Sequence, residues 1–240
     1  MAWLEAIYQP TTLFSLRPSW TTSSGGKSLL LPSPYALKMA VFDAAIRTSG
    51  LKPAENAWPW IRDLDVGIQL PRQIVVTNVF VRILRIKEIK TKASEKETAI
   101  AKAKEDQNWP FTRTIGYREF VYHPDPISLA FGVPDSHIAQ LSDWLGQINY
   151  LGKRGGFVQL LAPPRPLTEI DKFTVLTEEA KRFPIAGMMQ QLDDCDPQMK
   201  FEEANIYESK KPKRVVRHVV LPYRLIRSSR AYSLYERTGA

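Results

Sequence analysis

Cysteine is almost missing from this sequence, since Cys195 is the only one among 240 residues. A single thiol excludes a disulfide within the chain and a cysteine-based zinc site, and it favours a reducing cytoplasm. Acidic neighbours in LDDCDP (192–197) disfavour a thiolate, so we predict an inert residue at the surface or at a sheet edge. We interpret the acidic stretch as a solvated loop, because a hard cation needs more oxygen ligands at defined spacing and a turn glycine.

Long apolar runs are missing too. No stretch approaches the roughly 20 residues that a helix needs to span a bilayer. The first ten residues, MAWLEAIYQP, lack the basic start and the long apolar core of a signal peptide. We therefore expect a soluble, cytoplasmic protein with no membrane association.

Negative charge is in the minority. Thirty-three lysines and arginines stand against 25 acidic residues, which leaves a net charge of +8. An excess of positive charge favours an acidic partner, and nucleic acid is the commonest one. The apolar fraction of 44% and the charged fraction of 24% are those of an ordinary globular protein, large enough for one large domain or two small ones.

A stretch that looks like a nucleotide site lacks the parts that such a site needs. TTSSGGKSLLLPSPYALKMAV (21–41) contains Gly-Gly-Lys-Ser, but Thr21 stands at the position of the early glycine of a phosphate-binding loop. Pro18 weakens the preceding strand, and two prolines soon after Ser28 forbid a helix that opens at Lys27. We therefore expect no nucleotide cofactor. Two interpretations of Lys27 remain, a flexible polar turn or a contact with a nucleic-acid phosphate.

The expected elements follow an α+β order. Ser33 as N-cap, Pro34 at the first helical position and Gly50 at the end bound the clearest helix. The others are a strand over 2–17, a strand over 73–89, a hairpin of 117–123 with 126–133, a helix over 137–151, a glycine-rich turn and a strand from 157. This is the order of a ferredoxin-like βαββαβ unit, a scaffold shared with RNA-recognition domains.

The remaining segments are less regular. The charged stretch 90–108 has little to bury, so it is either a projecting helical arm or a mobile insertion. We divide the chain into a domain over 1–161 and a smaller β-rich part over 162–240. In the second part we expect a linker over 162–167, a short strand over 172–176, a loop over 178–200 and one or two basic strands over 213–234.

The turn in INYLGKRGGFVQL (148–160) places two bases among three glycines. Glycines permit a positive φ and let a backbone approach a ligand closely, and consecutive amides in such a turn can bind an anion. Lys153 and Arg154 add two positive charges there. One interpretation is a helix C-cap with two solvated bases, and the other is a phosphate contact.

Three motifs occur in an order and at a spacing that resemble a known family. They are LLLPSPYALKMAVFDAAI on the first helix, RTIGYREFVYH in the expected hairpin and INYLGKRGGF after the second helix. Together they resemble the small RAMP-type subunit of type I CRISPR surveillance complexes, the fifth of the numbered CRISPR-associated families. The resemblance covers about residues 1–160 well and the C-terminal third only vaguely.

The resemblance implies a ferredoxin-like RAMP domain with a projecting thumb over about 87–116. It also implies a subunit of the Cascade complex that caps the 5′ handle of the CRISPR RNA (crRNA). Such a subunit contacts the backbone and large subunits and meets target DNA through the complex. The implied RNA contacts are Lys27, Ser28, Tyr35, Lys38, Arg113, Tyr117, Arg118, Gly152, Lys153, Arg154 and Gly155.

The residues themselves add two features to this picture. Aromatic side chains that can stack on unpaired bases interleave with the basic groups. They are Trp20, Tyr35, Trp109, Phe111 and Tyr117. The basic tail ESKKPKRVVRHVV (208–220) is either a charged loop that feeds a strand or a track for phosphates.

Some members of the family cut precursor RNA with a tyrosine, a lysine and a histidine. Metal-independent cleavage needs a base near the 2′-hydroxyl and a cation on the phosphate. The cutting members use an adjacent Lys-His pair, whereas this chain offers only His123, His137 and His218, the last beside Arg217. We predict no catalysis. A processing endoribonuclease and a protein–protein module with an incidental basic surface are the two alternatives.

Overall fold

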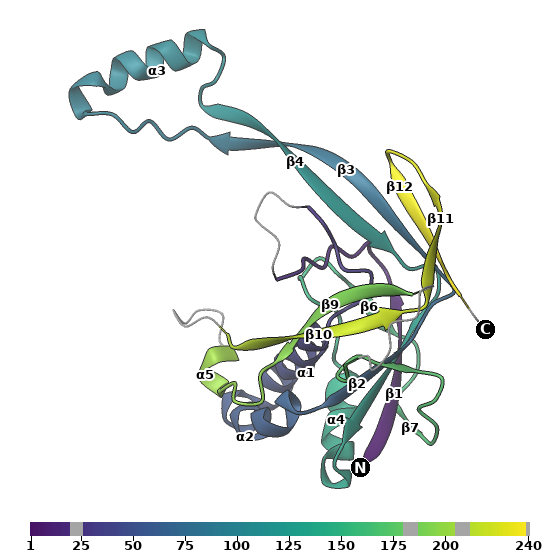
Figure 1. The fold of residues 1–240 in the computed structure, drawn as a ribbon. Helices are drawn as coiled ribbons and strands as arrows, with labels where there is room; N and C mark the ends of the chain where they lie inside the picture. The colour runs from purple at the N-terminus through teal and green to yellow at the C-terminus, as the bar shows by residue number, and fades with distance from the viewer. Residues whose placement is uncertain (20–25, 180–186, 205–211, 239–240) are drawn as a thin grey trace.

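The structure, a computed structural model, describes residues 1–19, 26–179, 187–204 and 212–238 (Figure 1). It is a mixed α/β fold whose described strands form three sheets. The helices are α1 (Pro34–Ser49), α2 (Leu51–Arg62), α3 (Lys96–Glu105), α4 (Ile138–Leu145) and α5 (Phe201–Ala204). The strands are β1 (Ala2–Pro10), β2 (Asp65–Gln69), β3 (Gln73–Ile86), β4 (Phe111–Tyr122), β5 (Ile127–Val133), β6 (Val158–Leu160), β7 (Arg165–Leu167), β8 (Thr174–Val175), β9 (Met188–Cys195), β10 (Arg214–Leu221), β11 (Tyr223–Ser228) and β12 (Tyr232–Arg237).

The central sheet has the strand order β6-β1-β5-β2-β8, with β7 also paired to β1, and every pairing is antiparallel. Every residue of β5, ISLAFGV, is buried. An unbroken apolar strand of this kind is expected in the middle of a sheet that is covered on both faces. Tyr8 of β1 donates a hydrogen bond to the Leu145 carbonyl of α4 (2.7 Å), which fixes that helix against the sheet.

The first helix forms where the sequence signals predicted it. The Ser33 side chain accepts a hydrogen bond from the Ala36 amide (3.2 Å), and Pro34 occupies the first turn. Gly50 ends the helix with a φ of 88°, a left-handed value that favours glycine. The next helix, α2, starts directly after this glycine, and the sequence analysis missed both α2 and β2.

The predicted hairpin of 117–123 with 126–133 is wrong. Strand β4 pairs with β3 along its whole length, from Val75↔Tyr122 to Ile86↔Phe111, while β5 pairs with β1 and β2. The Pro-Asp-Pro segment at 124–126 is a poor hairpin turn, because tight hairpin turns need residues that accept a positive φ. The chain instead changes sheets there.

Strands β3 and β4 form a long arm that projects from the rest of the molecule and carries α3 at its tip (Figure 1). Of the two interpretations of residues 90–108, the structure thus has the projecting helical arm. Strand β12 accompanies β3 only over residues 73–77, so the outer part of the arm is two-stranded. The predicted thumb, 87–116, therefore covers the tip of the arm and the outer half of β4, but it leaves out β3, whose outer half also belongs to the arm.

The predicted loop over 178–200 contains a strand. Strand β9 pairs with β10 in a two-stranded sheet, and α1 packs against β9. Cys195, predicted at the surface or at an edge, is 3% exposed, and burial raises the pKa of its thiol to about 12. Strands β7 and β8 extend the central sheet, and β11 and β12 belong to the same sheet as β3. Two sheets therefore contain strands from both sides of residue 161, and the domain boundary there stays a prediction.

Candidate nucleic-acid interface

The glycine-rich turn after α4 is closed by its own backbone. The Leu151 amide donates to the Gly156 carbonyl (2.8 Å), and Thr12 Oγ1 donates to the Gly155 carbonyl (2.7 Å). Gly152 has a φ of 72°, which an L-residue adopts only with strain. The exposed Lys153 and Arg154 therefore stand on a turn with a defined backbone.

Two other cations, Arg118 and Arg17, act electrostatically on Lys153. Burial lowers the pKa of Lys153 most, and the positive charges of Arg118 and Arg17 lower it further. Like charges disfavour the protonated form, and a polyanion relieves that repulsion when it binds. Arg17 comes from the long loop after β1, Arg118 from β4 and Lys153 from the glycine turn. We call Arg17, Arg118 and Lys153 the cationic cluster.

Lys27, the residue of the false nucleotide motif, has a carboxylate partner. Its Nζ lies 2.7 Å from Glu119 Oε1, and the side chains of Lys27 and Glu119 are 66% and 8% exposed. The hydrogen bond to Glu119 is the main reason why the pKa of Lys27 is raised. The same carboxylate accepts the Ser28 amide (2.9 Å), so the predicted contact residue Ser28 helps to hold the loop.

Tyr117 lies beside this pair. Its hydroxyl is 3.0 Å from Glu119 Oε1 and 2.8 Å from Asn78 Oδ1, and its ring tilts against that of Phe80 (centroids 5.4 Å apart). Burial first, and then the hydrogen bond to Glu119, raise its pKa. The ring is half-buried, and its hydroxyl stays protonated at neutral pH.

Two predicted contact residues belong to a different cluster. Lys38 is 3% exposed, and its Nζ lies 2.6 Å from Asp194 Oδ1. Arg217 Nε reaches the other oxygen of Asp194 at 3.4 Å, and the Arg214 guanidinium lies 3.8 Å above the ring centroid of Tyr35. Lys38 is therefore not at the surface, and the half-buried Tyr35 already stacks on an arginine.

The same cluster corrects the interpretation of LDDCDP as a solvated loop. Asp193 and Asp194 are 7% and 1% exposed and lie on β9. Asp193 accepts a hydrogen bond from Ser19 (2.6 Å) and pairs with Arg214 (3.3 Å). Buried carboxylates require such partners, and these partners come from distant parts of the chain. We call Lys38, Asp193, Asp194, Arg214 and Arg217 the ion-pair cluster.

Arg113, the remaining predicted contact, lies on the outer arm, five residues along β4 from Arg118. At about 3.4 Å per residue this separates the two by roughly 17 Å. Apolar side chains share this face of the arm by register and are well exposed. They are Phe80 (60%), Leu84 (61%), Ile86 (75%), Phe111 (45%) and Ile115 (75%). Of the predicted stacking residues, Trp109 is half-buried near the tip, and Trp20 lies outside the described residues.

The three histidines have separate surroundings. His123 is 1% exposed, neither ring nitrogen has a hydrogen-bond partner within the described chain, and burial lowers its pKa to about 4. His137 stacks on Trp60 with ring centroids 4.8 Å apart. His218 lies 3.3 Å from the Gln191 amide. None of these contacts joins a histidine to Lys27 or Tyr117.

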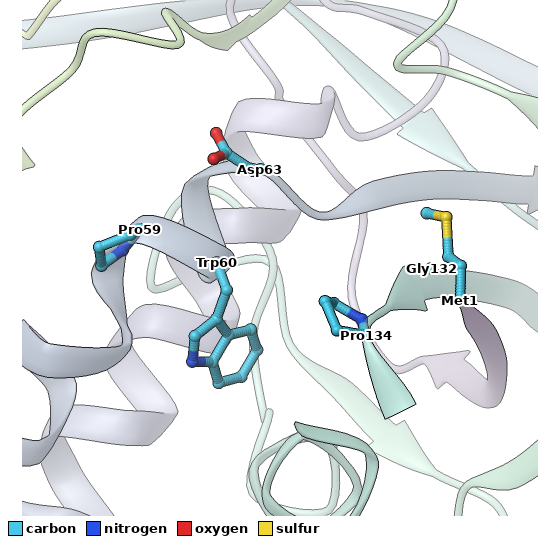
Figure 2. A pocket seen from close by; sticks show the side chains of 6 residues that line it. All are labelled: Met1, Pro59, Trp60, Asp63, Gly132 and Pro134. Atoms are coloured by element: carbon cyan, nitrogen blue, oxygen red, sulfur yellow. The ribbon is translucent and has the colours of Figure 1, made fainter. Parts of the chain in front are cut away.

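A cavity of about 460 Å³ lies elsewhere. Figure 2 shows Pro59, Trp60 and Asp63 at the end of α2 across from Pro134, with Met1 and Gly132 completing the lining. It shares no lining residue with the cationic cluster. Within the described ranges, no three His, Cys, Asp or Glu side chains lie close enough to hold a metal ion. None of the described helices has the length and hydropathy needed to cross a membrane.

Sequence reasoning missed Arg17 and Glu119. The signal for Glu119 was present, because an acid in the middle of the basic motif RTIGYREF invites the question of its partner. Arg17 carried no local signal, since only the fold brings it to the glycine turn. Lys210 and Lys211 of the basic tail lie outside the described residues, and Arg214 and Arg217 belong to the ion-pair cluster.

Comparisons with known proteins agree with the motif resemblance. No family model matches the chain. Over 222 residues the chain is 28% identical to the CRISPR-associated protein Cas5 of Archaeoglobus fulgidus, an alignment that covers 90% of this chain and 89% of the relative. A solved CRISPR protein from the same organism superposes with a TM-score of 0.49 and 14% identity, over 100% of this chain and 93% of that one. The similarity in sequence agrees with the resemblance that the motifs indicated, and the chain is similar to a CRISPR-associated protein of the Cas5 type.

Proposed function

We propose that this chain is the RNA-binding subunit of a type I Cascade complex that caps the 5′ handle of the crRNA. The observation that carries the proposal is the cationic cluster, where three segments bring like charges together beside a turn of fixed backbone. Phosphates are the natural counterions of such a surface. Lys153, Arg154 and Arg118 are the proposed backbone contacts, with Lys27 at the margin.

The proposed domain is a ferredoxin-like RAMP unit made of β1, α1 with α2, β2, β5, α4 and β6. The strand order β6-β1-β5-β2, antiparallel throughout, supports this proposal. The arm, inserted between β2 and β5, is then the thumb. Its exposed apolar face is suited to contacts with the backbone and large subunits, and target DNA is reached through the complex.

We further propose that the subunit does not cut RNA. A general base must lose its proton near neutral pH and reach the 2′-hydroxyl. Burial and Glu119 raise the pKa of Tyr117, Glu119 raises that of Lys27, and His123 is buried away from solvent. A cleavage assay on a CRISPR repeat RNA tests this, and specific metal-independent cleavage would favour the endoribonuclease alternative.

The capping role is tested by expressing the chain with the products of its neighbouring genes and sequencing the RNA that co-purifies. We expect uniform small RNAs that share one 5′ handle. Lys153→Glu with Arg154→Glu should lose them. Lys52→Glu with Arg72→Glu changes the net charge equally at exposed positions outside the cluster and should retain them. Recovery of protein partners without RNA would contradict the proposal and favour a protein–protein module.

A further inference from the structure

A buried acid, Glu119, follows Arg118 directly on β4. The Glu119 carboxylate accepts hydrogen bonds from Lys27 Nζ at 2.7 Å and from the Ser28 amide at 2.9 Å, and it shares the Tyr117 hydroxyl at 3.0 Å with Asn78 Oδ1. Its backbone amide also donates to the Gly26 carbonyl (2.7 Å). Hydrogen bonds to an ionised, buried acceptor are stronger than neutral ones, so these contacts fix the loop against β4.

The contacts of Glu119 continue towards the cationic cluster. Ser28 Oγ accepts the Leu16 amide (2.9 Å), and the Leu29 amide donates to the Leu16 carbonyl (2.7 Å). Arg17, whose charge acts on Lys153, is the next residue after Leu16. Both limbs of the loop after β1 are thus tied to the strand that carries Arg118.

The approach of the loop to β4 is close. A Cβ atom at Gly26 would overlap the carbonyl of Tyr117, so only glycine fits where the loop passes the strand. Phe14 exchanges backbone hydrogen bonds with Val121 farther down the same edge of β4 (2.9 and 2.7 Å). The loop therefore has one defined position against β4, and Glu119 is the charged group at this contact.

We propose that Glu119 is a positioning residue for RNA binding, which holds Lys27 and, through Ser28 and Leu16, Arg17 in register with Arg118 and Lys153. The inference rests on the proposed function, since it concerns the same surface. Charge alone gives the opposite expectation, because a carboxylate near RNA repels phosphates. Its hydrogen bonds outweigh that repulsion, because their loss frees two cations from a fixed geometry.

The chain contains a closely matched control, Glu5. Its side chain is also 8% exposed, it pairs with an arginine, Arg165, whose side chain is 68% exposed (2.7 Å), and it accepts a hydroxyl, that of Ser128 (2.6 Å). It lies on the central sheet, outside the surface that Glu119 organises. Glu5→Gln and Glu119→Gln therefore remove the same charge from equally buried positions.

The test measures the affinity of the full chain for a CRISPR repeat RNA at several salt concentrations. We expect Glu119→Gln to bind about tenfold more weakly despite its more positive net charge, and Glu5→Gln to bind within twofold of the wild type. The salt slope of Glu119→Gln should also fall, because fewer phosphates are contacted. A mere loss of folded protein would leave that slope unchanged.

Equal or tighter binding by Glu119→Gln overturns the inference while leaving the proposed function intact. Salt-independent or absent binding by the wild type instead contradicts the proposed function itself, and the inference falls with it. If thermal melting shows that Glu119→Gln is unfolded, Tyr117→Phe replaces it, because that change removes one donor and keeps the ring. A roughly threefold loss with a lower salt slope then supports the positioning role, because the loss of a direct contact to the neutral hydroxyl would leave the slope unchanged. Unchanged affinity or an unchanged slope overturns it.

Discussion

The cationic cluster and the ion-pair cluster draw on the same residue types and differ in their partners. In the ion-pair cluster, Lys38 and Arg217 both reach Asp194, and the side chains of Lys38 and Asp194 are shielded from water. In the cationic cluster, Lys153 and Arg118 form no ion pair within the described residues, and their charges act against each other. Compensated charges hold α1 to β9 and β10, whereas the like charges at the glycine turn are the ones we propose to meet RNA.

The net charge of the chain does not show which basic side chains are buried on acids and which are exposed. A basic side chain can meet phosphates only when the fold leaves it at the surface. Lys27 and Lys38 lie eleven residues apart in the sequence, yet Lys38 is buried on Asp194 and Lys27 is exposed beside Glu119.

Breaking the ion-pair cluster should have the largest effect on stability. Asp194→Ala leaves the Lys38 ammonium buried without a partner, and the free energy of unfolding should fall by about 3–5 kcal/mol. Urea denaturation measures this. Replacing both partners, with Lys38→Met and Asp194→Leu, should restore most of the loss, because the only charge left without Asp194 is that of the partly exposed Arg217. If Asp194→Ala leaves the free energy of unfolding unchanged, the Lys38–Asp194 ion pair does not stabilise the fold.

His123 gives a pH dependence of known sign. Burial lowers its folded-state pKa from the usual 6.5 to about 4, so below pH 6.5 the unfolded chain takes up a proton that the folded chain refuses. Stability is therefore fully present above about pH 6.5 and falls as pH approaches 4, by about 3 kcal/mol in total. Urea denaturation at several pH values measures it. His123→Leu should lose this component, and a variant that keeps the whole slope contradicts the assignment.

The backbone of the glycine turn comes next in size. Gly152→Ala places a Cβ at a φ of 72° and against the Leu16 side chain, and should cost about 1–2 kcal/mol of unfolding free energy. Gly155→Ala is the control, since nothing lies within 4 Å of the added Cβ. Thermal melting compares them. Equal losses in melting temperature for the two substitutions would contradict the left-handed φ of Gly152 and its close contact with Leu16.

The smallest effect on stability should come from the cationic cluster itself. Lys153→Ala removes a like charge and should change the free energy of unfolding by less than about 0.5 kcal/mol. Its effect should appear in RNA binding, where the slope of log affinity against log salt concentration should fall in magnitude by about one. Lys52→Ala, an exposed lysine on α2, should leave the slope unchanged. A large loss of stability in Lys153→Ala would place this residue with the ion-pair cluster.

Local signals allowed part of the fold to be predicted. Ser33, Pro34 and Gly50 are start and stop signals that act within one helix, and they bounded α1 correctly. Strand pairing is not local. Residues Gln73–Ile86 and Phe111–Tyr122 were recognised as containing strands, but nothing in either segment says that they pair with each other across α3.

The same distinction explains the site. The glycine turn with Lys153 and Arg154 was predicted because its residues are adjacent in sequence. The burial of Asp194 was not, because its partner Lys38 lies 156 residues away. Similarly, the meeting of Arg17, Arg118 and Lys153 depends on the position of the loop against β4, which no pattern within any one segment contains.

The most direct test of the central claim, that the cationic cluster meets crRNA, is crosslinking of RNA to protein by ultraviolet light in the co-purified complex, with mass spectrometry of the linked peptides. We expect crosslinks in the peptides that contain Arg118 and the glycine turn at 150–157, and their loss in Lys153→Glu with Arg154→Glu. Crosslinks that leave both of these segments untouched, on a complex that retains its RNA, would contradict this claim.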